Sequence, residues 1–539
     1  MALADLPNPI LVKELRGVMR GKRMLVAHFA CLALFSLVLL IAIASLAGET
    51  DARIDPSLIG QGIFAIFVFF QAAVVLVVFP AFGATSIVGE KDRKTEELLT
   101  MSPMPAWRIV SGKFQASLLL GLVFLMSTLP LVSLSFLFGG VSVYAILIAY
   151  LVLFVTAVFV VAFALFFSAN SRTNTRAVIA TYIFSVLLFI ALSIALEDVL
   201  DDLERFLMRG RASRYPFRGS VGFDWELIFF AIIVPAYAYL FSVSFFLLSA
   251  VNRLKPASAN KSTAMRVHYL VGTGIGIAIW ILGVETLYTV TPAPWQAYAG
   301  LISVVSVFMF LSGVFACEPV VLGARQRMGY AKLKGIERLL GVFLPGRRAG
   351  ADFVLMTSVL FLAAIVVMYG SFHPISLKGG GNFILILTVV ALSFVYTTFS
   401  CSVALLTSAI FRRSGVAKIV WGVVVVGLAV LPVFAYSFSR DDYRYENPGP
   451  AFSLADLSFL SWGIVHAVAI SEWDWVASAR KYDNTAVSIA GRPVSIFILF
   501  LVFYMLATMV VSVMARRIAR RRMAEELSGD ELQRQRARA

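Results

Sequence analysis

Twelve long apolar stretches follow one another along this chain and constrain its fold more than any other feature. They fall at 24–47, 58–84, 114–138, 142–168, 177–196, 225–251, 267–288, 295–316, 353–372, 383–411, 419–438 and 494–515. A helix needs ~20 residues to cross a hydrocarbon core of ~30 Å. Only 14% of the residues are charged, against about 25% in soluble chains. The sequence therefore predicts an all-α polytopic membrane protein with twelve transmembrane helices, and it excludes a soluble enzyme.

The basic residues orient these spans. Most of the 46 lysines and arginines lie in the seven segments on one side, which include both termini. The positive-inside rule makes this side cytoplasmic, in a multi-pass protein of the cell (inner) membrane. The densest cluster, Arg516–Arg522, is typical of an anchor on lipid headgroups, so no nucleic-acid partner is expected despite a net charge of +15.

Loop lengths repeat between the two halves of the chain. In each half a long inner loop precedes a short one, and a long outer segment, 197–224 or 439–493, precedes the last span. Six spans per half give both halves the same orientation. This pattern predicts a pseudo-dimer with halves at 1–252 and 267–516, a cytoplasmic linker at 253–266 and a basic cytoplasmic tail at 517–539.

The N-terminal segment has the pattern of an interfacial helix. Asn8 can cap it and Pro9 suits its first position. One face is apolar and the other basic, formed by Leu11, Leu15 and Val18 and by Lys13, Arg16, Arg20 and Arg23. Such a helix is expected to lie on the inner leaflet, with its apolar face toward the lipid.

The loop between the second and third spans combines helix caps with an apolar tip. Thr95 can cap a short helix whose first turn holds Glu96 and Glu97, where carboxylates complement the helix dipole. Ser102-Pro103 then restarts the chain toward the third span. The tip consists of Leu98, Leu99 and Met101. A short helix with an exposed apolar tip suits docking in a groove of another protein, although packing under the loop is the simpler interpretation.

Two motifs resemble those of one family, the type-2 ABC exporter permeases. The first is Asn8-Pro9-Ile10-Leu11 followed by Lys13-Glu14-Leu15. The second comprises Gly89-Glu90-Lys91, Arg93, Thr95, Glu97, Leu98-Leu99, Pro103 and Gly112-Lys113. The resemblance covers residues 8–170, and Lys94 stands where the family commonly has glycine.

The resemblance implies a permease subunit that exports a substrate with ATP hydrolysed by a separate ABC ATPase subunit, present in two copies. The second-half loop, 317–352, lacks the signature, and a degenerate second docking site is one interpretation of it. The resemblance to ABC exporter permeases is also compatible with further permease or periplasmic subunits in the transporter. The implied coupling helix and its surroundings comprise Glu90, Arg93, Thr95, Glu97, Leu98, Leu99, Met101 and Pro103, while the interfacial helix carries Lys13, Glu14, Arg16 and Arg20.

Enzyme chemistry is not expected in this chain. It contains no G-x-x-x-x-G-K-[ST] phosphate-binding loop, so ATP and Mg²⁺ are expected in the partner and no cofactor in the chain itself. Its four histidines and three cysteines are scattered without ligand spacing, which indicates no metal site. Glu285 and Gln71 are the polar candidates within the membrane.

Two other functional classes compete with this interpretation. A secondary transporter of the major-facilitator kind also has twelve spans in two parallel halves, and Gly89–Lys94 partly imitates its loop motif. The spans hold few carboxylates for proton coupling, which disfavours it. A multispan membrane enzyme ranks third, because no His/Asp cluster lies at a membrane face.

Overall fold

The chain divides into two compact units in the computed structural model. The first unit comprises Met1–Phe223 with Ala236–Ala257, and the second comprises Asp224–Pro235 with Ser258–Ala539. The residues that the structure describes are 8–48, 56–95, 104–186, 233–256, 259–287, 301–318, 335–372, 380–425, 486–489 and 492–536, apart from single positions or pairs within some ranges, together with Phe229, Met328 and Gly427. Each unit is described by itself.

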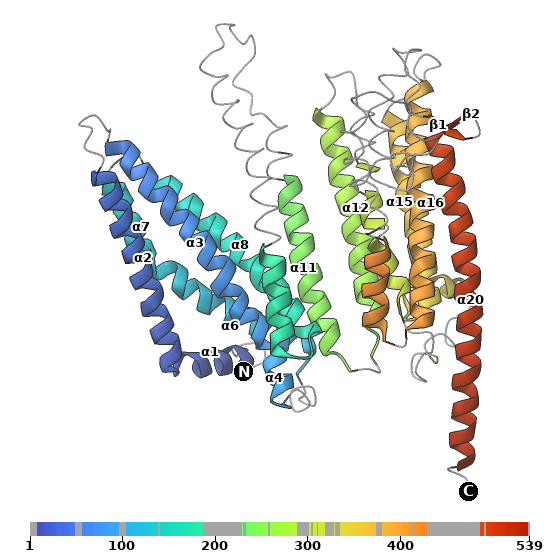
Figure 1. The fold of residues 1–539 in the computed structure, drawn as a ribbon, viewed down its shortest axis with the longest axis horizontal. Coiled ribbons are helices and arrows are strands. Elements are labelled where there is room, and N and C mark those ends of the chain that lie inside the picture. The colour runs from blue at the N-terminus through green and yellow to red at the C-terminus, as the bar shows by residue number, and fades with distance from the viewer. Residues whose placement is uncertain are drawn as a thin grey trace. The chain divides into compact units, whose positions relative to one another are not determined.

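The first unit is helical throughout its described part (Figure 1). Its elements are α1 (Pro9–Met19), α2 (Lys22–Gly48), α3 (Pro56–Ser86), α4 (Val88–Asp92), α6 (Ala106–Ser127), α7 (Leu129–Leu137), α8 (Val143–Asn170), a helical stretch at 174–186 and α11 (Val234–Leu254).

The second unit is mainly helical. Its elements are α12 (Ser262–Leu287), the 3-10 helices η3 (Ser312–Ala316) and η4 (Gly335–Phe343), α15 (Arg347–Phe372), α16 (Gly380–Ile410), β1 (Ala486–Ile489), β2 (Arg492–Ser495) and α20 (Ile496–Arg536). Its core packs α16 against α20 and α15, with Tyr396 and Tyr504 in edge-to-face contact at 5.0 Å.

Eight of the described helices are long and apolar enough to cross a membrane. They are Gly60–Ser86, Ala106–Ser133, Val143–Asn170, Val234–Leu254, Ser262–Gly283, Arg347–Ser371, Val389–Ile410 and Leu501–Glu525. Shorter apolar helices, His28–Leu37, Val305–Ala316 and Ser414–Val425, fall within or overlap three more predicted spans. The predicted span 177–196 is described only to residue 186, where it is helical. A multi-pass membrane protein is thus supported, whereas twelve crossings and a pseudo-dimer of halves 1–252 and 267–516 stay predictions.

The core of the first unit forms where α3 packs against α8. An added Cβ at Gly83 would lie 2.6 Å from the Cβ of Ala164, so glycine permits this close approach. Aromatic rings complete the packing on the other side of α8, where Phe163 contacts Phe184 at 4.7 Å and Phe246 at 6.4 Å between ring centroids. This packing holds the ends of α3 and α8 side by side.

The predicted third span is interrupted near its middle. α6 ends at Ser127 and α7 begins at Leu129, with Pro130 in the second position of α7. Proline lacks a backbone N–H and crowds the preceding turn, so it suits the first turn of a helix and kinks or breaks a helix interior. Pro130 accounts for this break. The sequence predicted one continuous helix at 114–138 because the effect of this proline was not considered.

A β-hairpin is the one departure from the all-α prediction among the described residues. β1 and β2 pair antiparallel, with Ala486 opposite Ser495 and Ile489 opposite Arg492. The predicted outer segment 439–493 thus includes strand structure at its end. The long helix α20 follows at once and continues through the basic cluster that was assigned to a tail. The Nη1 of Arg522 donates to the carbonyl of Ala409 at 3.0 Å, so this part of the tail is packed against the end of α16.

Candidate functional site

The two motifs that carry the resemblance meet in the structure. Asn8 caps α1, accepting a hydrogen bond from the Ile10 amide at 3.2 Å, as predicted. Its amide nitrogen donates to the carbonyl of Arg108 at 2.7 Å. A Cβ at Gly112 would lie 2.8 Å from that amide nitrogen, so glycine leaves room for the Asn8 side chain against α6. Motifs about 100 residues apart in sequence therefore form one packed contact.

α1 lies across the end of the first unit, at a steep angle to α2 (Figure 1). Its Ile10 is buried, while Lys13, Arg16 and Arg20 are exposed and Leu11, Leu15 and Val18 are half-buried. The predicted helix and its segregated faces are present. Its location at a lipid surface stays a prediction.

A buried lysine of α6 contacts three other helices at this end of the unit. Lys113, at the start of α6, is 1% exposed, and its Nζ lies 2.8 Å from Oε1 of Glu14 and 3.1 Å from Oε1 of Glu90. It also donates to the carbonyl of Ser86 at 2.8 Å. These three acceptors match the three N–H donors of an ammonium group. Lys13, which is exposed, adds a second ion pair to Glu90 at 3.2 Å.

α4, at the start of the predicted signature loop, is also tied to α8. The hydroxyl of Ser168 accepts the backbone amides of Ile87 and Val88, each at 3.0 Å. Lys91 donates to the carbonyls of Ala169 and Ser171 at 2.6 and 3.2 Å. These bonds satisfy carbonyl groups that the end of a helix leaves without partners. A displacement of α4 would therefore be transmitted directly to α1, α6 and α8.

Asp92 extends these contacts to the next helix. Its Oδ2 accepts the backbone amide of Asn174 at 3.2 Å. A carboxylate at the first turn of a helix satisfies a free amide and complements the helix dipole. The short loop after α8 is thereby fixed to α4.

α4 ends in a Schellman motif. The amide of Thr95 donates to the carbonyl of Glu90 at 2.9 Å, and the amide of Lys94 donates to that of Lys91 at 3.0 Å. Lys94 adopts the left-handed conformation with φ of 57°. This motif usually places glycine at that position, and Lys94 is the residue that departs from the family pattern. The backbone geometry thus survives the substitution, at the cost of local strain.

Substitutions of Lys94 should separate this strain from the lysine charge. Lys94→Gly is expected to leave stability unchanged or to raise it by up to about 1 kcal/mol. Glycine adopts positive φ without steric cost, but the greater entropy that it gives the unfolded chain offsets part of this gain. Lys94→Val should lower stability by about 1–2 kcal/mol. The measurement is the midpoint of thermal unfolding in detergent. Arg93→Val removes the same charge at a position with negative φ, −83°, and should change little; equal losses in both valine variants would contradict this account.

A cavity of about 760 Å³ opens beside the lysine cluster, between α1, α3, α4 and α6. Its lining includes charged side chains, such as Glu14, Glu90 and Lys113, and apolar ones, such as Phe82 and Leu120. No group of three or more His, Cys, Asp or Glu side chains in the described part of the chain is placed to hold a metal ion.

The structure places three of the predicted coupling residues. Glu90 lies in the lysine cluster, Thr95 closes α4 with its hydroxyl donating to the Glu90 carbonyl at 3.2 Å, and Arg93 is exposed beside the cavity. The other five lie outside the described residues: Glu97, Leu98, Leu99, Met101 and Pro103. Sequence reasoning quoted Gly112-Lys113 as a motif but missed Lys113 as the centre of the cluster. It also missed Ser168, for which the sequence held no signal.

Of the two polar residues predicted within the membrane, the structure describes the side chain of one. Gln71 in α3 is 2% exposed and donates to the hydroxyls of Thr128 and, at 2.8 Å, of Tyr150. These contacts link α3 to the α6–α7 break and to α8, so Gln71 faces partner helices. Glu285 belongs to α12 by its backbone, and its side chain lies outside the described residues.

The second unit has its own buried cation near the predicted loop 317–352. Arg266, at 0% exposure, lies 2.9 Å from Oε1 of Glu318. Its Nη1 also donates to the carbonyls of Val342 and Leu344, at 2.6 Å each. Arg266 therefore fixes the chain after η3 and the end of η4 to the start of α12. No sequence motif indicated this contact.

Comparison with known proteins identifies one stretch of the chain. No curated protein and no solved structure matches the chain. Residues 8–217 match the family model of the ABC-2 family transporter proteins, and this range contains α1, the lysine cluster and α4. The match confirms the resemblance that the two motifs indicated and does not favour a secondary transporter. Residues 8–217, which are less than half of the chain, are thus similar to the membrane proteins of the ABC-2 transporter family.

Proposed function

We propose that this chain is the permease subunit of an ABC exporter and is driven by a separate ATPase subunit that docks on the loop at 96–103. The observation that carries the proposal is the attachment of α4, directly before this loop, to α1, α6 and α8. A docking loop is useful for coupling only if its displacement moves membrane helices. The family match supplies the class of transporter.

The contacts around α4 suggest how the movement is transmitted. Glu90 binds Lys113 of α6 and Lys13 of α1, while Lys91 binds the end of α8. A push on the loop would shift these helix ends together, because the ion pairs and backbone hydrogen bonds resist separation. ATP and Mg²⁺ belong to the partner in this proposal, since the chain has no phosphate-binding loop. The two ATPase copies would require a second contact, for which the loop 317–352 is the candidate.

Docking is tested by placing charges on the apolar tip. Leu98→Asp together with Leu99→Asp is expected to reduce recovery of the ATPase in a pull-down tens- to hundreds-fold. Loss of two buried leucine anchors costs about 2–4 kcal/mol, before the desolvation of two charges is added. The permease should remain at its normal abundance in the membrane.

A matched control adds two carboxylates nearby without removing an anchor. Thr173→Asp with Thr175→Asp does so at the start of the helical stretch 174–186, where both threonines are exposed and acidic groups suit the helix dipole. This control should recover the ATPase normally. Equal recovery with the Leu98/Leu99 variant, or loss of that variant from the membrane, would assign the tip to packing and reject the docking site.

We also propose that both termini and the α4 end of the first unit are cytoplasmic, in the inner membrane. Labelling with a membrane-impermeant maleimide tests this in a Cys31→Ala background. Ser213→Cys should react in intact cells, and Leu340→Cys, at a position where leucine is 58% exposed, should react only after permeabilisation. Cys317 and Cys401 are buried, and burial raises the pKa of the Cys317 thiol to about 11, so neither should contribute. If Leu340→Cys reacted in intact cells and Ser213→Cys reacted only after permeabilisation, the proposed orientation would be wrong.

A further inference from the structure

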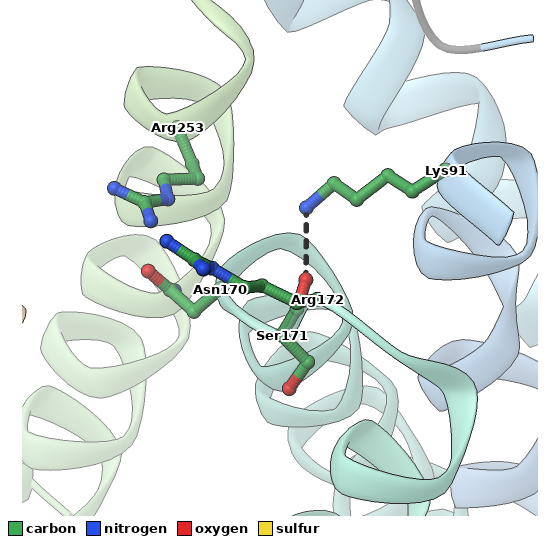
Figure 2. A pocket seen from close by; sticks show the side chains of 5 residues that line it. All are labelled: Lys91, Asn170, Ser171, Arg172 and Arg253. Atoms are coloured by element: carbon green, nitrogen blue, oxygen red, sulfur yellow. Dashed lines mark hydrogen bonds between the residues drawn. The ribbon is translucent and has the colours of Figure 1, made fainter. Parts of the chain in front are cut away.

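A second pocket at the α4 end of the first unit is lined by cations from three segments of the chain. Its volume is about 350 Å³, and its lining consists of Lys91, Asn170, Ser171, Arg172 and Arg253. Lys91 comes from α4, Arg253 from the last turn of α11, and the other three from the end of α8 and the residues after it. Figure 2 shows Arg172 and Arg253 on one side of the pocket and Lys91 reaching in from the other.

The charges of this pocket are not balanced by its own lining. Three cations and no carboxylate line it. Asp92, next to Lys91, is directed to the amide of Asn174 instead. Within the described part of the chain, the guanidinium groups of Arg172 and Arg253 have no hydrogen-bond acceptor or ion-pair partner. Like charges in one pocket repel each other, and an anion between them would convert that repulsion into attraction.

The pocket is held in shape by contacts that do not use the two arginines. The Lys91 ammonium is fixed by the carbonyls of Ala169 and Ser171, and Figure 2 shows the bond to Ser171. The Asn170 amide donates to the carbonyl of Phe166 at 2.8 Å. The cationic lining therefore does not depend on a ligand for its position, while both guanidinium groups stay available to one.

The pocket lies where two candidate membrane spans end. Val143–Asn170 ends at a lining residue, and Val234–Leu254 ends one residue after Arg253. Charged lipid headgroups lie at the ends of membrane spans, and clusters of basic residues beside a span attract anionic lipids. A protein partner with an acidic surface is the competing occupant, but it would not require cations placed at the level where the spans end.

We propose that Lys91, Arg172 and Arg253 form a binding site for a phosphate group, supplied by the headgroup of an anionic phospholipid. Planar guanidinium groups bind phosphate oxygens through paired hydrogen bonds, and the lysine adds a point charge. The site goes beyond the proposed transport function and does not depend on ATPase docking. Its ligand would reinforce the junction of α4, α8 and α11.

Lipid retention by the purified full-length chain tests the site. The protein is exchanged into detergent containing equal amounts of phosphatidylglycerol and phosphatidylcholine, and the retained lipid is counted by native mass spectrometry. Wild-type protein should retain phosphatidylglycerol preferentially. Arg172→Gln with Arg253→Gln should lower that preference about 30-fold, which corresponds to about 1 kcal/mol for each of two cations. Neither arginine has a hydrogen-bond acceptor among the described residues, so the variant should remain folded.

The control is a variant with the same loss of charge elsewhere. Arg176→Gln with Arg413→Gln removes two exposed arginines that do not line the pocket, and it should retain phosphatidylglycerol as wild type does. Displacement of phosphatidylglycerol by inorganic phosphate at millimolar concentration would assign the site to a free anion and would overturn the lipid headgroup as its ligand. If the Arg172/Arg253 variant and the control retained phosphatidylglycerol with equal preference, the proposed site would be overturned. So would unchanged lipid retention combined with loss of the ATPase, which would assign the arginines to a protein contact.

Discussion

Lys113→Met is expected to destabilise the first unit by about 3 kcal/mol. The substitution retains the apolar stem but leaves Glu14 and Glu90, whose side chains are only 26% and 14% exposed, close to each other without their shared cation. Removing one partner of a buried ion pair leaves an uncompensated charge, which costs about 3–5 kcal/mol, and partial exposure moves the estimate to the lower end. The carbonyl of Ser86 also loses its donor. The measurement is the thermal unfolding midpoint in detergent together with abundance in the membrane.

Two further variants separate charge from packing at this cluster. Adding Glu14→Gln and Glu90→Gln to Lys113→Met should recover part of the lost stability, because no charge is then left unpaired. Lys13→Met removes a lysine that also pairs with Glu90 but is 65% exposed, and it should cost less than about 1 kcal/mol. A Lys113→Met protein as stable as wild type would show that the cluster does not hold α1, α4 and α6 together.

Arg266→Met should have the larger effect, a loss of about 3–5 kcal/mol from the second unit. The guanidinium is fully buried, pairs with Glu318, binds two carbonyls at 2.6 Å and lies 5.8 Å from the ring centre of Phe353. Methionine would remove the donors that Arg266 supplies to Glu318 and to the carbonyls of Val342 and Leu344. Thermal unfolding and membrane abundance again provide the readout.

Arg266→Lys tests whether charge alone suffices at this position. A lysine is a point donor and cannot reproduce the planar fork that reaches Glu318 and two carbonyls at once, so it should recover less than half of the loss. Arg348→Met, in the same segment, removes an exposed arginine and should change stability by less than about 0.5 kcal/mol. Full recovery by Arg266→Lys would reduce the role of Arg266 to its charge.

Local features of the first unit could be predicted from the sequence because they depend on neighbouring residues. Asn8 and Pro9 start α1 where predicted, since a cap and a first-turn proline act within a few residues. The apolar stretches predicted helices, since a span must satisfy its backbone hydrogen bonds within itself. The motifs containing Asn8 and Gly112-Lys113 indicated the resemblance that the family match over residues 8–217 confirms. They could do so because both carry packing and charge that the fold requires.

The contacts that join distant segments were decided only by the tertiary structure. That Lys113 would lie between Glu14 and Glu90, or Arg266 beside Glu318, depends on how helices pack, and charge patterns in a sequence do not specify which distant partners meet. The left-handed Lys94 is similar, since a lysine gives no local signal for positive φ and the hydrogen bonds that close α4 impose it. The sequence by itself determined a basic, multi-span membrane protein whose residues 8–217 are similar to the ABC-2 transporter family. The tertiary structure decided which charges are buried in pairs and which, at Arg172 and Arg253, face a pocket without a counter-charge, because pairing depends on distances that only the packed helices set.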